Sequence, residues 1–289
     1  MKNIFLWVVA VIITIAAAIY QRTTGPTYPI KGTLETQGQA YKYKLLRTHE
    51  TTASAKITLP DTGASDFKAA LHYKRYMTKD TMTVLAFTKD TDVFTAQLPV
   101  QPSAGKMEYF ITGNINGKSF RMPNEGEDNI VLRYKDPVPN WVLFPHIFFM
   151  FFAIMFGMRA GISALFQPEN MRKWAITSLI GMTIGGMMLG PIVQKYAFGE
   201  YWTGFPYGKD FTDNKMLIMW LSWLLAMAVI GFKPKKKEMI SRAVVIFATI
   251  MMTLAYLIPH SMGGSTLDYD KIDQGIDPKE AIKTGAEDK

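Results

Sequence analysis

The chain divides into stretches with two different patterns of hydrophobic and polar positions. Residues 1–20 and 140–260 hold most of the long apolar runs, whereas residues 21–139 and 261–289 have the mixed composition of water-soluble sequence. An α-helix needs about 17–25 mostly apolar residues to cross the hydrocarbon of a bilayer. The pattern therefore predicts an integral membrane protein with one folded domain outside the membrane, between its first and second hydrophobic segments.

Five apolar segments have a length that suits a membrane-spanning helix. They cover Ile4–Tyr20 and approximately residues 141–164, 174–193, 216–232 and 243–258. The first lies in the N-terminal region 1–22 and is a signal anchor or a signal peptide, because Ala16-Ala17-Ala18 offers a plausible cleavage site. The other four predict a four-helix transmembrane domain over residues 140–260.

The basic residues predict the orientation, because short cytoplasmic loops are enriched in Lys and Arg. One group surrounds the connection between the second and third segments, and another lies between the fourth and fifth: Arg159, Arg172, Lys173, Lys233, Lys235, Lys236, Lys237 and Arg242. The 194–215 loop is nearly neutral, and the polar tail 261–289 is rich in acids. We therefore predict a multi-pass membrane protein with its N-terminus in the cytoplasm and its tail outside.

Residues 26–137 alternate apolar and polar positions over short runs, such as Ala55-Lys56-Ile57-Thr58-Leu59 and Thr83-Val84-Leu85-Ala86-Phe87. Alternation with period 2, interrupted by turn residues, is typical of β-strands. Asn116-Gly117 is a strong signal for a two-residue hairpin turn. Seven or eight such runs predict a periplasmic antiparallel β-sandwich of the immunoglobulin or fibronectin III kind. The predicted fold class is thus an α+β membrane protein.

Charge and cysteine content narrow the classes of function. The net charge is +8 and the sequence has no cysteine. Much of the basic excess lies in loops that flank the apolar segments, where it orients the protein, so nucleic acid is not an expected partner. The absence of cysteine excludes disulfides, iron–sulfur clusters and thiol chemistry.

The loop before the fourth segment is dense in aromatic residues, with Gly and Pro at positions that impose turns. Such aromatics suit a water–lipid interface, and we expect the loop to be ordered and packed on the helices. Asp213 precedes the predicted fourth helix and is expected to cap its free N–H groups. The alternative is a metal site, in which Asp210, Asp213 and Glu200 bind a cation.

Two histidines are candidate ligands at the outer end of the helices. His146 and His260 each follow a proline, and the predicted topology places both at one membrane depth. Two imidazoles there could bind haem iron or, with Asp210 or Glu200, a divalent metal. The alternative is that both bond to backbone carbonyls near helix ends. His49 and His72 stand alone in the β-domain and are interpreted as surface residues.

The third segment contains glycines with a spacing that favours close helix packing. Gly181 and Gly185 are four residues apart, as are Gly186 and Gly190. Small residues at this spacing let two helix backbones approach closely. We expect packing within the bundle, and an oligomer interface is the alternative.

Three stretches of sequence together resemble a known family. They are Trp202-Thr203-Gly204-Phe205-Pro206-Tyr207-Gly208-Lys209-Asp210-Phe211-Thr212-Asp213-Asn214-Lys215, Pro145-His146, and Pro259-His260-Ser261-Met262. They resemble a family of uncharacterised bacterial polytopic inner-membrane proteins with an outer β-domain and a WTGxPxGxDxTDNK-type loop. The resemblance extends from the late β-domain to about Tyr269. It implies the same architecture and supplies no activity.

These observations favour a non-enzymatic protein over a catalyst. The leading hypothesis is a binding or assembly subunit of a bacterial envelope complex, which contacts other membrane or periplasmic proteins through its β-domain and outer loop. The first alternative is a haem- or metal-binding redox subunit that uses His146 and His260. The second is a transporter, which ranks last because no ionisable residue lies in the middle of a predicted span.

Overall fold

The computed structural model describes residues 2–36, 38–233, 238–260 and 263–283. Lys235, Lys236 and Lys237, used above for orientation, and Ser261 and Met262 of the resemblance lie outside the described residues. The chain forms two compact units. In the described chain, the helical unit holds residues 2–26 and 138–264, and the β unit holds residues 27–137 and 265–283.

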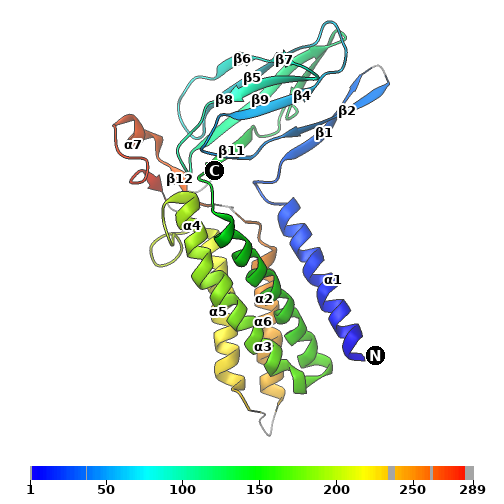
Figure 1. Cartoon of the computed structure of the whole chain (residues 1–289), viewed down its shortest axis with the longest axis vertical. Coiled ribbons are helices and arrows are strands. Elements are labelled where there is room, and N and C mark those ends of the chain that lie inside the picture. Colours follow the sequence, from blue (N-terminus) through cyan, green and yellow to red (C-terminus); the bar gives the residue numbers. More distant parts are fainter. Residues whose placement is uncertain (1, 37, 234–237, 261–262, 284–289) are drawn as a thin grey trace. The chain divides into compact units, whose positions relative to one another are not determined.

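Seven helical elements form the helical unit (Figure 1). They are α1 (Lys2–Thr23), α2 (Asn140–Phe166), α3 (Pro168–Met182), the π-helix η1 (Thr183–Leu189), α4 (Gly190–Phe198), α5 (Phe211–Ile230) and α6 (Met239–Leu257). α3, η1 and α4 follow one another without a break, so the third apolar segment is one long helix. Five helices among the described residues are therefore long and apolar enough to cross a membrane.

The polarity of the helical unit is inverted relative to a water-soluble bundle. Many large apolar side chains are exposed, including Phe5 on α1, Phe148 on α2 and Leu225 on α5. The buried positions include small and polar residues, such as Ser163 and Ser178. A large apolar surface is unfavourable when it is exposed to water. The exposed apolar side chains of these helices therefore favour an apolar surrounding for this unit.

Glycines set the closest helix contacts. A Cβ atom at Gly181 would lie 2.9 Å from the Cβ of Ala153 on α2, and one at Gly185 would lie 2.8 Å from that of Phe149. A Cβ at Gly186 would collide with Met216 on α5. These glycines of α3 and η1 therefore pack inside the unit.

A second glycine pair, Gly157 and Gly161, lies on α2 and was not predicted from the sequence. A Cβ at Gly161 would lie 2.6 Å from Thr249 on α6, and one at Gly157 would collide with Met252. The Thr249 hydroxyl also donates to the carbonyl oxygen of Gly157 at 3.2 Å. The spacing of this pair is the signal that could have identified it.

The β unit contains thirteen strands and one short helix among the described residues. They are β1 (Ile30–Thr36), β2 (Gln39–Leu45), β3 (Thr48–Glu50), β4 (Ala55–Pro60), β5 (Lys68–Arg75), β6 (Thr83–Ala86), β7 (Thr88–Asp90), β8 (Val93–Leu98), β9 (Lys106–Ile115), β10 (Lys118–Met122), β11 (Ile130–Lys135), β12 (Thr266–Leu267), α7 (Tyr269–Asp273) and β13 (Ile282–Lys283). Together with the helical unit, they make the chain an α+β protein.

Four sheets organise these strands. The largest has the order β3-β11-β9-β5-β6, with β10 paired to β9, and a second has the order β4-β8-β7. β1 pairs with β2, and β12 pairs with β13. All described pairings are antiparallel except β3 with β11. The predicted hairpin at Asn116-Gly117 is confirmed, since the two residues join β9 to β10 with φ values of 51° and 72°.

One hydrophobic core joins the two larger sheets. Ile57 and Leu98 of the three-stranded sheet and Leu71, Ile111 and Leu132 of the six-stranded sheet belong to one buried cluster. Each of these side chains is at most 1 % exposed. The alternation along the strands supplies this core, because every second side chain of a strand points to the same face.

The C-terminal segment 265–283 belongs to the β unit, whereas the sequence analysis set residues 261–289 apart as a polar tail. The Tyr269 hydroxyl accepts the backbone N–H of Lys106 at 3.1 Å and lies 3.0 Å from its carbonyl oxygen. Arg75 forms a bidentate pair with Asp273, with distances of 2.6 and 2.9 Å. These contacts join residues far apart in sequence, so composition alone could not identify them.

Candidate functional site

Polar side chains, four of them buried, gather at the end of the helical unit where α4 ends, α5 begins and α6 ends. We name this group the polar cluster, and its members are His146, Gln194, Thr203, Asp210, Asp213, Lys215 and His260. Thr203, Asp210, Asp213 and Lys215 are each at most 6 % exposed. Buried charges are costly unless they are paired and hydrogen-bonded, so each member requires an account of its partners.

Asp213 fixes the loop that precedes α5. Its carboxylate accepts the backbone N–H of Thr203 at 2.6 Å and lies 3.2 Å from the Thr203 hydroxyl. Gln194, on α4, donates to the same hydroxyl at 2.6 Å. The buried carboxylate thereby joins α4, the loop and α5.

The structure corrects the predicted helix cap. α5 begins at Phe211, and the N-cap is Asp210, whose carboxylate accepts the N–H of Thr212 at 2.7 Å. Asp213 lies inside the first turn of the helix and bonds to the loop instead. The prediction placed Asp213 wrongly because it started the helix at the apolar run from Met216, five residues after its true start.

The loop is held in a defined conformation by further backbone contacts. Asn214 accepts the N–H of Phe205 at 2.7 Å, and the Trp202 indole donates to the carbonyl of Phe205 at 3.0 Å. A Cβ at Gly204 would lie 2.6 Å from that of Asp213, so glycine permits this close approach. As a result, Tyr201, Phe205 and Tyr207 are displayed at 56, 69 and 80 % exposure.

Lys215 connects α5 to the end of α6. Its ammonium donates to the carbonyl oxygen of Ile258 at 2.6 Å, and Asp210 supplies a nearby negative charge. A free carbonyl at a helix C-terminus carries partial negative charge, which a cation stabilises. Lys215 therefore positions the segment that carries His260.

His146 projects from α2 toward the π-helix. Its Nδ1 lies 2.8 Å from the carbonyl oxygen of Gly185. A carbonyl can only accept, so Nδ1 carries the proton and the Nε2 of the neutral ring presents a lone pair. A Cβ at Gly190 would lie 3.7 Å from Cε1 of this ring, which is an ordinary contact distance, so the ring lies beside Gly190.

His260 lies just beyond α6, and its imidazole has no hydrogen-bond partner among the described residues. The side chain has an exposed surface, yet many protein atoms surround the ring. This crowding, together with Lys215 and His146, lowers the pKa of His260 below its ordinary value.

The acidic residues suggested as metal ligands are arranged differently. Asp210 and Asp213 accept backbone N–H groups of their own loop and helix, and Glu200 is exposed beside Gly199. Within the described ranges, no three His, Cys, Asp or Glu side chains lie together in a group suited to a metal ion. Asp210 and Asp213 therefore order the backbone of the loop and the first turn of α5.

The two histidines of the β unit have structural neighbours. His72 stacks on Phe110, with ring centroids 4.5 Å apart, and its Nε2 lies 2.8 Å from the Thr112 hydroxyl. His49 lies 2.8 Å from the carbonyl of Glu50 through Nδ1. His72 therefore contacts a threonine hydroxyl and an aromatic ring, and His49 contacts a backbone carbonyl.

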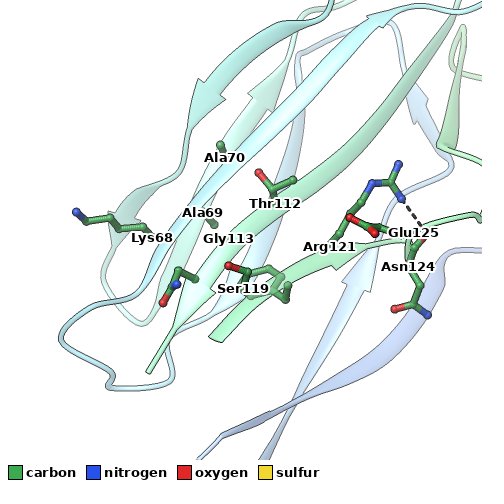
Figure 2. Close-up of a pocket in the computed structure, with 11 residues that line it drawn as sticks. Lys68, Ala69, Ala70, Thr112, Gly113, Ser119, Arg121, Asn124 and Glu125 are labelled. Carbon is green, nitrogen blue, oxygen red and sulfur yellow. Dashed lines mark hydrogen bonds between the residues drawn. The ribbon is translucent and has the colours of Figure 1, made fainter. Parts of the chain in front are cut away.

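A shallow depression of about 840 Å³ lies on the outer face of the six-stranded sheet (Figure 2). Small side chains such as Ala70, Thr112 and Ser119 lie on its neighbouring strands. Arg121 donates to the carbonyl oxygens of Pro123 and Asn124 at 2.6 and 2.9 Å, so it holds the adjacent loop. Lys68 and Glu125 also line the depression.

Arg159 on α2 is a buried charge. From the sequence it was grouped with the basic residues around the connection between the second and third apolar segments. It is fully buried, and its guanidinium donates to Ser163, to Asn3 at 2.7 Å and to Gln167 at 3.0 Å. The ring of Trp7 lies 5.5 Å from it. Two of these partners belong to α1, so this helix is tied to the bundle at its N-terminal end.

Neither a scan against models of protein families nor a search of curated proteins finds a match to this chain.

Proposed function

We propose that the chain is a non-enzymatic, multi-pass protein of the bacterial inner membrane and a binding or assembly subunit of an envelope complex. In this proposal the β unit is a periplasmic sandwich of the immunoglobulin-like kind. Partners contact it and the loop before α5. The five apolar helices and the inverted polarity of the helical unit support the membrane location.

The chain connectivity supports the orientation. The β unit is joined to the helical unit after α1, before α2 and after α6. A single folded unit lies on one side of a membrane, so these three helix ends share that side. At their opposite ends, Arg172 pairs with Glu238 at 2.9 Å, and Arg242 donates to the carbonyl of Ala164 at 2.6 Å. Basic residues at this end favour the cytoplasm.

One observation carries the binding role: the loop before α5 is rigid and displays aromatic side chains. Its backbone is fixed by Asp213 and Asn214, while Tyr207 is 80 % and Phe205 69 % exposed. Exposed Tyr and other aromatics on a preorganised backbone are common at the centre of protein interfaces, because little entropy is lost on binding. The depression on the β unit is the second surface that we assign to partners.

The test is site-specific crosslinking in cells. A photoreactive phenylalanine analogue replaces Tyr207, and in a matched chain it replaces Leu225, which is 53 % exposed on α5. We expect position 207 to form a crosslink to one defined membrane or periplasmic protein, and position 225 to crosslink lipid. A reciprocal purification through that protein should then recover this chain.

A double substitution, Phe205→Ala with Tyr207→Ala, tests the same surface without a probe. It should shift the purified assembly to a smaller size in mild detergent, while the helical content stays constant. Crosslinking of position 207 to lipid alone, together with an unchanged assembly size in the double variant, would contradict the proposed role.

A further inference from the structure

His146 and His260 are more than 100 residues apart in the sequence, yet both lie at the same end of the helical unit. His146 contacts Gly185 of η1, and a Cβ at the next residue, Gly186, would collide with Met216 of α5. Lys215, adjacent to Met216, bonds to Ile258, two residues before His260. This continuous series of contacts brings both imidazoles to the same end of the bundle.

The two rings have the properties of metal ligands. The Nδ1 proton of His146 is held by a backbone carbonyl, which orients the ring and leaves the Nε2 lone pair available. His260 has no hydrogen-bond partner among the described residues. The π-helix beside them is a rare element that is frequent at functional sites.

The surroundings distinguish between possible ligands. Zn²⁺ usually takes four ligands, but the described chain has no group of three His, Cys, Asp or Glu. The ammonium of Lys215 also disfavours a second cation of high charge nearby. The space beside Gly185 and Gly186, which a porphyrin would need, is filled by Phe149, Met150 and Met216.

We propose that His146 and His260 form a binding site for a cuprous ion. Cu(I) has a single charge, and imidazole is among the ligands that suit copper. It also accepts as few as two neutral ligands, which is the number that this pair provides. The site is independent of the proposed partner surface, since neither histidine belongs to the loop that displays Tyr207.

The experiment uses the full chain, purified in detergent and kept anaerobic with a reductant. Cu(I) is titrated in competition with a chromogenic Cu(I) chelator. We expect one Cu(I) per chain, and an affinity at least about 100-fold lower in His260→Ala, since loss of outer partners alone costs 10–100-fold. His49→Ala and His72→Ala, in the β unit, are matched controls that should bind as the native chain does.

His146→Asn is the sharpest variant, because its amide can still donate to Gly185 while it removes the free Nε2. We expect it to fold with native thermal stability and to lose Cu(I). Equal Cu(I) affinity in the native chain, His146→Asn and His260→Ala would overturn the proposal. So would a purified chain that carries haem, seen by its absorption spectrum, or that prefers Zn²⁺ under the same competition.

Discussion

The β unit and the helical unit solve the problem of burial in opposite ways. Among the described residues of the β unit, the large exposed apolar side chains are few: Met77, Val84, Leu85 and Val100. Its core contains aliphatic residues with Tyr109 and Tyr134. The helical unit exposes rows of Ile, Leu and Phe and buries Arg159, Asp213 and Lys215.

This difference shows what holds each unit together. In the β unit the removal of apolar area from water is the main stabilising contribution. In the helical unit, close packing at glycines and hydrogen bonds to buried polar groups are the main stabilising contributions. Burial of a leucine side chain gains little in an apolar solvent, because that solvent is as apolar as the side chain. Substitutions at matched positions can therefore separate the two regimes.

The largest effect is expected in the core of the β unit. Ile111→Ala should lower the free energy of unfolding by about 2–5 kcal/mol, because it removes a fully buried side chain and leaves a cavity. Leu225→Ala, at a position that is 53 % exposed on α5, should change stability by no more than about 0.5 kcal/mol in detergent. Hydrogen exchange measured separately for peptides of each unit checks both values. A large cost at Leu225 would show that this face is buried in an assembly.

The next effect concerns the buried charge in the helical unit. Asn3→Leu should destabilise the unit by about 1.5–3 kcal/mol, because it removes a hydrogen bond to a buried guanidinium. Arg159→Met should cost less, since replacing a buried charge by an apolar side chain of similar size is often neutral. Thermal unfolding in detergent, followed by tryptophan fluorescence, compares the two variants. A greater cost for Arg159→Met would mean that the charge itself stabilises the bundle.

A smaller and more local effect is expected at the loop before α5. Asp213→Ala leaves the N–H of Thr203 without its acceptor and should cost about 1–3 kcal/mol. The loop should become sensitive to protease near Tyr201, whereas the helices should stay intact. Asp210→Ala, which removes the helix cap and the negative charge near Lys215, should cost about 1 kcal/mol. It should leave the loop more resistant to protease than Asp213→Ala does. Equal cleavage of both variants would contradict the role assigned to Asp213.

Local patterns predicted the kind of element in each unit, although residues 30–135 form eleven strands where seven or eight were expected. Period-2 alternation indicated the strands, apolar length indicated the five helices, and Asn116-Gly117 indicated a hairpin that the structure confirms. These features depend on neighbouring residues, so a single sequence contains them. The immunoglobulin-like sandwich and the membrane orientation stay predictions.

The details of the site depended on contacts that the sequence does not contain. The role of Asp213 was missed because its partner, Thr203, is ten residues away in a loop of irregular conformation. Two neighbours of Arg159, Asn3 and Trp7, lie on α1, more than 150 positions away. The π-helix arises where Gly190-Pro191 interrupts the regular hydrogen bonds, since proline has no N–H to donate.

The smallest expected effect is a pH dependence of the β unit. Arg75 donates to Asp80 at 2.6 and 3.0 Å and lowers the pKa of that carboxyl to about 2. The folded pKa lies below the unfolded value of about 3.9, so the pair stabilises at neutral pH. That contribution should fade as the pH falls from about 4 toward 2. Both side chains are about a third exposed, and solvent screening should keep the effect below about 1 kcal/mol.

Denaturant unfolding of residues 27–137 linked to 265–283, compared with the Asp80→Asn variant, measures this contribution. The two stabilities should differ at pH 7 and converge near pH 2, and added salt should reduce the difference. Lys56→Gln, which breaks the exposed pair with Asp90, is the matched control and should show a smaller difference at pH 7. A gap between native chain and Asp80→Asn that persists at pH 2 would show that Asp80 acts through its hydrogen bonds and not through its charge.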